Sequence, residues 1–366
     1  MRPQTEQGVL VLADISGFTR FLSETELEHA HDILSEILQL VVGRLTPTLH
    51  LAEVEGDAVF AFAPQDRFPR GETLLELVEQ TYCLFLGRVE SIRLHTTCSC
   101  SACSAVPVLD LKFVIHTGEY IVQALGSGKK PMGSSVNLAH RLLKNQVQEQ
   151  TGWKAYAMIT ESAARHLAIP TSGMHPEIER YENFEPIQTF SFDLRQRWAV
   201  LQSARRVHVG TAEADIVNTV DLPAPPEVVW DWLNDPRLRS QWFGLTNERP
   251  PGPDGRSGVG TTTHCTHGEQ IKSVHTIVDW HPFEYYTEEI SRPSDGRRMA
   301  LNTVEIESIP EGTRLHDRYR VLMTPRLLSV PFFRMARPSQ QAALGRLAQL
   351  VVPPSPPATD RQLSSG

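Results

Sequence analysis

Val9–Leu22 reads VLVLADISGFTRFL, an apolar run that leads through an acidic residue into a turn and a second apolar pattern. The apolar run Val9–Leu12 predicts a buried strand, which Asp14 is expected to close. Ser16 and Gly17 then predict a turn, because glycine accepts the backbone conformations that tight turns require. The apolar spacing after the turn predicts a short helix.

The start of that helix predicts an anion site, because the first backbone N–H groups of a helix have no acceptor within it. The groups expected to point at the anion are those of Gly17, Phe18 and Thr19. A second acidic turn, Glu53–Phe60, lies between two apolar runs and predicts a hairpin that brings Asp57 beside Asp14. Two carboxylates that face a phosphate-sized space predict a divalent-metal site.

Four strings carry a resemblance: ADISGFTRFL (13–22), EVEGDAVFAF (53–62), FVIHTGEY (113–120) and GSSVNLAHRL (133–142). In this order they resemble the successive signatures of the class III adenylyl/guanylyl (nucleotidyl) cyclase catalytic domain, in a bacterial sub-branch with a Cys cluster before the third signature. The resemblance implies a ferredoxin-like α+β fold. The expected element order, β-α-β-β-α-β, indicates the same fold.

The resemblance also implies the chemistry of the site. A ribose 3′-hydroxyl attacks the α-phosphate of a nucleoside triphosphate and expels pyrophosphate, with two Mg²⁺ or Mn²⁺ ions per site. Asp14 and Asp57 would hold both ions, and the carbonyl of Ile15 would complete one shell. In the alternative interpretation, Asp14 is a helix N-cap and Asp57 a turn residue.

Asn137 and Arg141 are four residues apart and therefore share one helix face. A similar pair in the cyclase family orients the ribose and stabilises the phosphate in the transition state. The family builds its site across a dimer interface, so the resemblance implies a homodimer with two shared sites. A solvated helix face is the alternative interpretation of the pair.

The sequence leaves the choice between ATP and GTP open. Four residues before Asp57, adenylyl cyclases typically carry Lys and guanylyl cyclases Glu, and this chain has Glu53. Three residues before Gly133, adenylyl enzymes carry Asp and guanylyl enzymes Cys, whereas this chain has Lys130. The phosphate-binding Lys that the family places near its last strand is missing from residues 181–187. A weak or degenerate enzyme is therefore an alternative.

A cysteine cluster precedes the third signature. Its candidate ligands for a structural Zn²⁺ are His95, Cys98, Cys100 and Cys103. Three thiolates and an imidazole can form a tetrahedral shell, although this spacing is tighter than that of most structural zinc motifs. A redox-sensitive or iron–sulfur cluster and unliganded thiols are the alternatives.

The second half has a different pattern: a strand, a short helix, several strand-like runs and a closing helix at about Phe332–Val351. With the string LPAPPEVVWDWLNDPRLRSQW (222–242), this order resembles the START-like helix-grip fold, also called SRPBCC. Such domains often enclose an apolar cavity, so an apolar small molecule is an expected partner. The candidate lining residues are Trp242, Phe243, His264, His275, Trp280, Tyr285, Tyr286 and Tyr319.

Length and charge limit the number of domains and the kinds of binding partner. A chain of 366 residues is long enough for two domains, and a formal net charge of −8 argues against a nucleic-acid-binding surface. No stretch approaches the apolar length of a membrane span, and the expected location is the cytoplasm. The predicted parts are a cyclase-like domain at 1–195, a linker at 196–210, a START-like domain at 211–352 and a disordered tail at 353–366.

These patterns favour a nucleotidyl cyclase, a phosphorus–oxygen lyase of signal transduction, regulated by a ligand-binding START-like domain. One rival is a degenerate nucleotide or lipid sensor that uses the cyclase fold for binding and dimerisation. The other is a START-like carrier with a structural dimerisation domain.

Overall fold

The computed structural model divides the chain into two compact units, Met1–Ala204 and Arg205–Gly366. The residues that it describes are 4–68, 70–95, 101–125, 128–203, 206–244, 246–248, 256–267 and 270–351. No helix within these ranges has both the length and the apolar character that a membrane crossing demands. Each unit contains a sheet of its own, which confirms the mixed α+β class.

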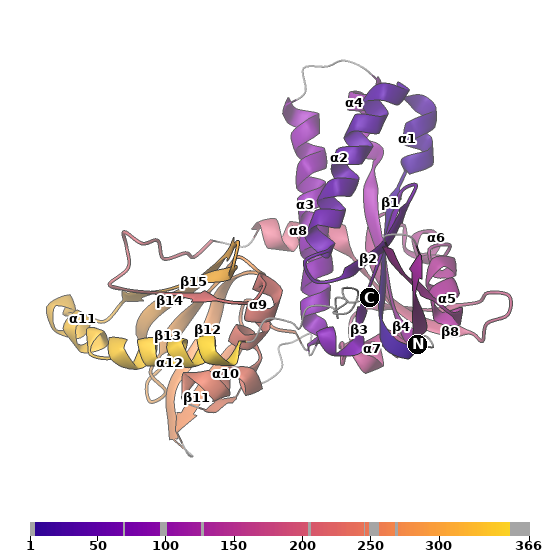
Figure 1. The fold of residues 1–366 in the computed structure, drawn as a ribbon. Helices are drawn as coiled ribbons and strands as arrows, with labels where there is room; N and C mark the ends of the chain where they lie inside the picture. The colour runs from indigo at the N-terminus through magenta and orange to yellow at the C-terminus, as the bar shows by residue number, and fades with distance from the viewer. Residues whose placement is uncertain are drawn as a thin grey trace, which may run out of the picture. The chain divides into compact units, whose positions relative to one another are not determined.

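The first unit is built on one mixed sheet. Its strands are β1 (Thr5–Ser16), β2 (His50–Glu55), β3 (Ala58–Pro64), β4 (Asp110–Leu125), β5 (Gly128–Met132), β6 (Tyr156–Thr160), β7 (His175–Glu179) and β8 (Ile187–Asp193). They lie in the order β2-β3-β1-β4-β6-β8-β7, with β5 paired to β4. β1 is therefore central, between its antiparallel neighbours β3 and β4 (Figure 1).

The helices of this unit are α1 (Phe18–Glu24), α2 (Leu27–Leu45), α3 (Gly71–His95), α4 (Ser101–Ala105), α5 (Ser134–Leu142), α6 (Val147–Thr151), α7 (Glu161–His166) and α8 (Leu194–Ser203). Single 3₁₀ turns occur at Gln65–Arg67 and Val106–Val108. α2 buries one face at helical spacing and lies beside α3 (Figure 1).

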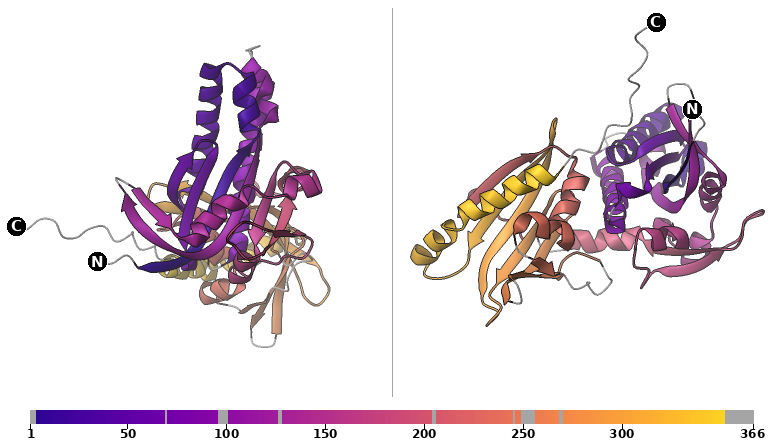
Figure 2. Two further views of the ribbon diagram at one scale, coloured as in Figure 1. Left: turned by 90° about the vertical axis from the view of Figure 1, so that its right-hand side faces the viewer. Right: turned by 60° about the horizontal axis from the view of Figure 1, so that its bottom comes forward.

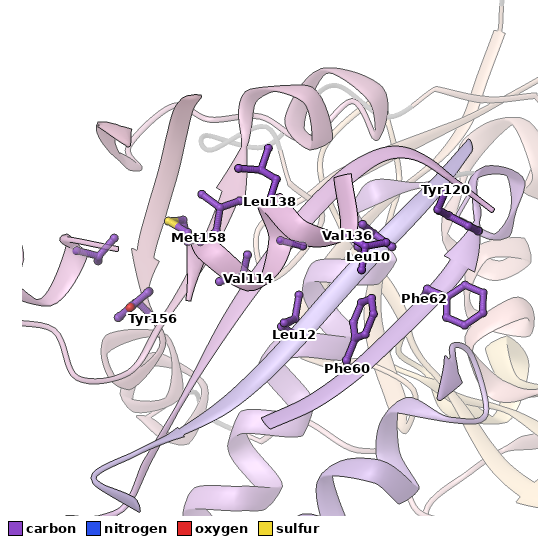
Figure 3. Close-up of a cluster of buried hydrophobic side chains, with 13 residues drawn as sticks. Leu10, Leu12, Phe60, Phe62, Val114, Tyr120, Val136, Leu138, Tyr156 and Met158 are labelled. Carbon is purple, nitrogen blue, oxygen red and sulfur yellow. The ribbon is translucent and has the colours of Figure 1, made fainter. Parts of the chain in front are cut away.

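The apolar run of β1 is continuous because both faces of the sheet are covered. Leu10 and Leu12 pack in one cluster with Val136 and Leu138 of α5 (Figure 3). The residues between them point to the opposite face, since side chains alternate along a strand, and α2 and α3 contact the sheet there. β1 extends beyond Asp14 to Ser16, which differs from the expected strand end, because Asp14 and the next residues still pair with β4.

His116 on β4 is buried, and its Nδ1 lies 3.0 Å from Oγ1 of Thr160. Burial lowers the pKa of the His116 imidazole to about 4. The unfolded chain takes up this proton near pH 6.5, so protonation favours unfolding. The free energy of unfolding is therefore expected to fall by up to about 3 kcal/mol as the pH falls from 6.5 to 4.

Urea unfolding of wild type and His116→Gln at several pH values measures this effect. In the variant, the free energy of unfolding of the first unit should fall by less than in the wild type between pH 6.5 and 4, because the buried imidazole is gone. Equal pH dependence in the two proteins would contradict the assignment.

The second unit has an antiparallel sheet in the order β10-β11-β12-β13-β14-β15-β9. Its strands are β9 (Ile216–Leu222), β10 (Thr246–Glu248), β11 (Thr262–His267), β12 (Gln270–His281), β13 (Tyr285–Ser291), β14 (Arg298–Ile309) and β15 (Gly312–Val321). Its helices are α9 (Pro226–Asn234), α10 (Pro236–Phe243), α11 (Arg326–Arg334) and α12 (Arg337–Leu350). α12 contacts α10 and β9 along this sheet (Figure 2).

The C-terminal end differs from the single closing helix expected from the sequence. The structure has two helices there, and Pro338 lies in the first turn of the second one, α12. Proline favours the first turn of a helix because its missing N–H is not needed there. α10 was not expected either; Asp235 caps it by accepting from the backbone N–H groups of Arg237 and Leu238.

Candidate catalytic and metal site

Strand pairing brings the two predicted metal carboxylates together. Asp14 pairs with Ala58 of β3 on one side and with Lys112 of β4 on the other. The backbone N–H of Ile15 donates to the carbonyl of Asp57 at 3.1 Å. The turn between β2 and β3 is thus fixed against β1, and both acidic residues lie at the same end of the central strands.

The negative charges of Asp14 and Asp57 repel each other. Burial raises the pKa of the Asp57 carboxyl, and the negative charge of Asp14 raises it further, while Lys112 opposes this shift. Nζ of Lys112 lies 3.0 Å from Oδ2 of Asp14, with side chains only 19% and 15% exposed. The ammonium also donates to the carbonyl of Leu143 at 3.3 Å. Lys112 therefore supplies the positive charge beside Asp14.

The donor set suits a hard divalent cation, because it consists of carboxylate and carbonyl oxygens. The raised pKa of Asp57 has the same implication, since a cation between two like charges relieves their repulsion. A metal ion would compete with the ammonium of Lys112 for the carboxylate of Asp14. Apart from this competition, the oxygen donors fit Mg²⁺ or Mn²⁺.

Gly17 forms the turn between β1 and α1. Its φ is +84°, a conformation that favours glycine. A Cβ at this position would lie 2.7 Å from the carbonyl oxygen of Val108, so a side chain has no room. Gly17 and Thr19 are exposed and Phe18 is half-buried. An anion in solution could therefore reach this helix start. The contact itself stays a prediction.

Asn137 and Arg141 lie on the solvent side of α5. Both are exposed, whereas the residues on the opposite face of the helix are buried in the core. The side chains of this pair make no hydrogen bond or ion pair with any residue that the structure describes. Within one chain they are thus free to contact a second molecule, as the predicted shared site requires.

Glu53 and Lys130, the two predicted base-reading residues, form an ion pair between β2 and β5. They are 77 positions apart in the sequence. Each side chain remains partly exposed. An acceptor and a donor therefore lie side by side where the edge of a base is expected.

The zinc prediction falls mostly outside the described residues. Cys98 and Cys100 lie in the gap at 96–100, and the side chain of His95 is not described. Cys103 is half-buried on α4. The cluster stays a prediction.

Sequence reasoning missed Lys112, the one cation that touches the carboxylate pair among the described residues. Its signal is weak, because a lysine near the start of a strand is common on surfaces. Only the register of β1 against β4 places it opposite Asp14.

Two protein-family models match separate parts of the chain. Residues 34–151 match a family described as "Protein of unknown function (DUF2652)". Residues 213–352 match the family "Polyketide cyclase / dehydrase and lipid transport". The second match agrees with the START-like fold expected for this half.

An uncharacterized protein of Mycobacterium tuberculosis is 32% identical over 117 residues, which are 31% of this chain. The match spans about half of that relative's length, 52%.

Similar solved structures include adenylyl cyclase CyaB of P. aeruginosa, with 16% identity, a TM-score of 0.41 and coverage of 52% of this chain and 95% of that one. Guanylyl cyclase Cya2 has 16% identity and a TM-score of 0.41, over 52% of this chain and 93% of its own. A bacterial light-regulated adenylyl cyclase has 14% identity and a TM-score of 0.39, over 55% of this chain and 58% of its own.

Proposed function

We propose that the first unit is a class III nucleotidyl cyclase that converts GTP or ATP into a 3′,5′-cyclic nucleotide and pyrophosphate. The observation that carries the proposal is the junction of Asp14 and Asp57 beside the open Gly17 turn. A START-like second unit regulates the output by binding a small molecule. Formation of the cyclic nucleotide by purified protein tests the proposal.

Each residue then has a role. Asp14, Asp57 and the carbonyl of Ile15 would hold the divalent ions. Bound there, the ions would lower the pKa of the 3′-hydroxyl and neutralise charge on the attacking and leaving oxygens. Asn137 orients the ribose, and Arg141 stabilises the charge that develops on the α-phosphate. Backbone N–H groups of α1 contact the triphosphate.

The exposure of Asn137 and Arg141 supports a homodimer in which they complete the partner's site. A closed two-fold dimer repeats each contact, so it would contain two equivalent sites. The proposed catalyst is therefore the dimer.

Lys112 is proposed to compete with the metal for Asp14, because its ammonium already pairs with that carboxylate. Lys112→Met should bind Mn²⁺ about 10-fold more tightly, since the competing cation is gone and two like charges remain. Electron paramagnetic resonance of free Mn²⁺, without nucleotide, measures the affinity. Lys129→Met, an exposed lysine on β5, is the control and should leave the affinity unchanged. Unchanged or weaker binding in Lys112→Met would refute the competition.

A degenerate sensor is the second candidate, and the absence of a cation from residues 181–187 favours it. Such a protein would bind a nucleoside triphosphate and dimerise without forming product. A carrier would instead retain an apolar molecule and bind no nucleotide in the presence of millimolar Mg²⁺ or Mn²⁺.

A further inference from the structure

Helix α11 is apolar on the side that faces solvent. Leu327, Met335 and Leu328 are 89%, 79% and 73% exposed. The N–H of Met335 donates to the carbonyl of Pro331 at 3.2 Å, so the helical turn continues to this residue. Leu328 and Met335 are seven residues apart and therefore share one side of the helix, with Leu327 next to them. A surface helix normally carries polar residues on this side, so these side chains are available to an apolar partner.

The opposite side of α11 is fixed to the sheet of the second unit. Phe333 packs against a buried cluster that contains Ile216 of β9 and Tyr319 of β15. Ser329 is buried, and its Oγ donates to the carbonyl of Met323 at 2.8 Å. α11 itself lies at one end of the unit, away from α9 and α10 (Figure 1). Packing on the inner side thus holds the apolar side outward.

Positive charge accompanies this apolar side, although the whole chain has a formal net charge of −8. Every Asp, Glu, Lys, Arg or His position between residues 318 and 351 holds arginine, namely Arg318, Arg320, Arg326, Arg334, Arg337 and Arg346. The first three pair with carboxylates. The last three donate to backbone carbonyls, which carry no net charge. Three cations near the end of the chain are therefore not neutralised by these contacts.

Arg334 and Arg337 lie close to the exposed apolar side chains. Arg334 follows Leu327 by seven residues, so the two share one side of the helix. Both arginines are exposed and line an open groove beside β9. A long arginine side chain can lay its stem on apolar material while its guanidinium stays at a polar boundary. Exposed leucines flanked by arginines are typical of a helix that lies in the surface of an anionic membrane.

Other occupants fit this face less well. A two-fold contact with a second copy would bring Arg334 and Arg337 of both copies together, and like charges repel. A nucleic acid would pair with the arginines but leave the leucines uncovered. An anionic lipid surface matches both the apolar and the cationic groups.

We propose that α11 docks this protein on the surface of an anionic membrane. Leu327, Leu328 and Met335 enter the boundary between headgroups and acyl chains, and Arg334 and Arg337 contact lipid phosphates. The attachment is peripheral and reversible, because three apolar side chains bury little area. The inference goes beyond the proposed function and does not depend on cyclase activity.

Co-sedimentation of the full-length protein with vesicles tests the inference. One set of vesicles contains phosphatidylcholine alone, and the other contains phosphatidylcholine and phosphatidylserine in a three-to-one ratio. The wild type should bind the anionic vesicles at least about 10-fold more tightly than the neutral ones, because each arginine near an anionic surface adds to the attraction. High salt should weaken this binding, since it screens the charges.

Two double variants separate the apolar from the electrostatic contribution. Leu327→Gln with Leu328→Gln should weaken binding to the anionic vesicles by at least about 10-fold, because the exposed apolar area is lost. Arg334→Gln with Arg337→Gln should remove the preference for anionic over neutral vesicles.

Matched controls come from the first unit. Leu27 is 73% exposed, the same fraction as Leu328, and Arg165 is an exposed arginine on α7. Leu27→Gln and Arg165→Gln should leave binding to both kinds of vesicle unchanged. All of the substituted positions are exposed, so the fold should persist, and urea unfolding checks that it does.

The wild-type protein decides the matter even where a variant fails to fold. No binding to either kind of vesicle, or equal binding to both, would overturn the inference. Full binding by the double leucine variant would also overturn it, because the contact would then lie elsewhere. If the wild type binds no vesicles but forms a larger species than the leucine variant in analytical ultracentrifugation, α11 contacts a second copy and not a membrane.

Discussion

Asp57→Asn is expected to lower the rate of cyclic nucleotide formation by at least about 10³-fold, because the metal ions would lose an anionic ligand and several kcal/mol of charge stabilisation. The amide has the size of the carboxylate, and the backbone contact between Ile15 N–H and the Asp57 carbonyl does not involve the side chain. The fold should therefore persist. Circular dichroism and urea unfolding check that it does.

Arg141→Ala should be inactive for a different reason, since the exposed guanidinium is proposed to act on the substrate held by the partner subunit. The two variants can therefore complement each other. When they are mixed and allowed to exchange subunits, half of the dimers are mixed and each mixed dimer has one intact site. About one quarter of wild-type activity should return.

The mixture also separates a shared site from one built within a single chain. If each chain carried a complete site, neither variant could supply what the other lacks. No recovery of activity in a mixture shown to contain mixed dimers would contradict the shared site.

The double substitution Glu53→Lys with Lys130→Asp is expected to reverse the base preference, from GTP in the wild type to ATP in the variant. The ion pair of Glu53 and Lys130 is the pair described for adenylyl cyclases with the two charges exchanged. Guanine offers N1–H and N2–H donors to a carboxylate and O6 to an ammonium. Adenine offers one donor beside one acceptor, so it makes fewer contacts with this arrangement.

The ratio of kcat/KM for GTP to kcat/KM for ATP measures the preference. The wild-type ratio should exceed 1, and the double variant should change it by about 10²-fold, because the edge of the wrong base would leave hydrogen-bonding groups of the site unpaired. Lys129→Glu changes a neighbouring exposed lysine and should leave the ratio unchanged. A wild-type preference for ATP, or a ratio that the double variant does not move, would refute this assignment of the pair.

The sequence predicted the central strand well because its apolar run is long and both of its faces are buried. It also placed Asp57 beside Asp14, since a tight glycine turn leaves few alternatives for the following strand. Lys112 was not predicted because its position beside Asp14 depends on the register of two strands almost a hundred residues apart in the sequence. The local pattern of residues in each strand does not specify that register.

The second unit shows the same limit. Of the eight residues expected to line a cavity, Trp242 and Phe243 of α10, Tyr286 of β13 and Tyr319 of β15 do so. His264, His275, Trp280 and Tyr285 do not line it. Arg239 was not expected there, because α10 was not recognised as a helix. Asp235 and Pro236 form a helix start that could have revealed it. The charge balance around Glu288 depends on side chains from α10, β12 and β13, which only the tertiary structure brings together.

The most direct test of the central claim is cyclic nucleotide formation by purified full-length protein given GTP or ATP with Mn²⁺, run beside Asp57→Asn. We expect product from the wild type, with GTP as the better substrate, and none above background from the variant. A wild-type protein that binds nucleotide and dimerises but forms no product would contradict the cyclase and identify a sensor instead.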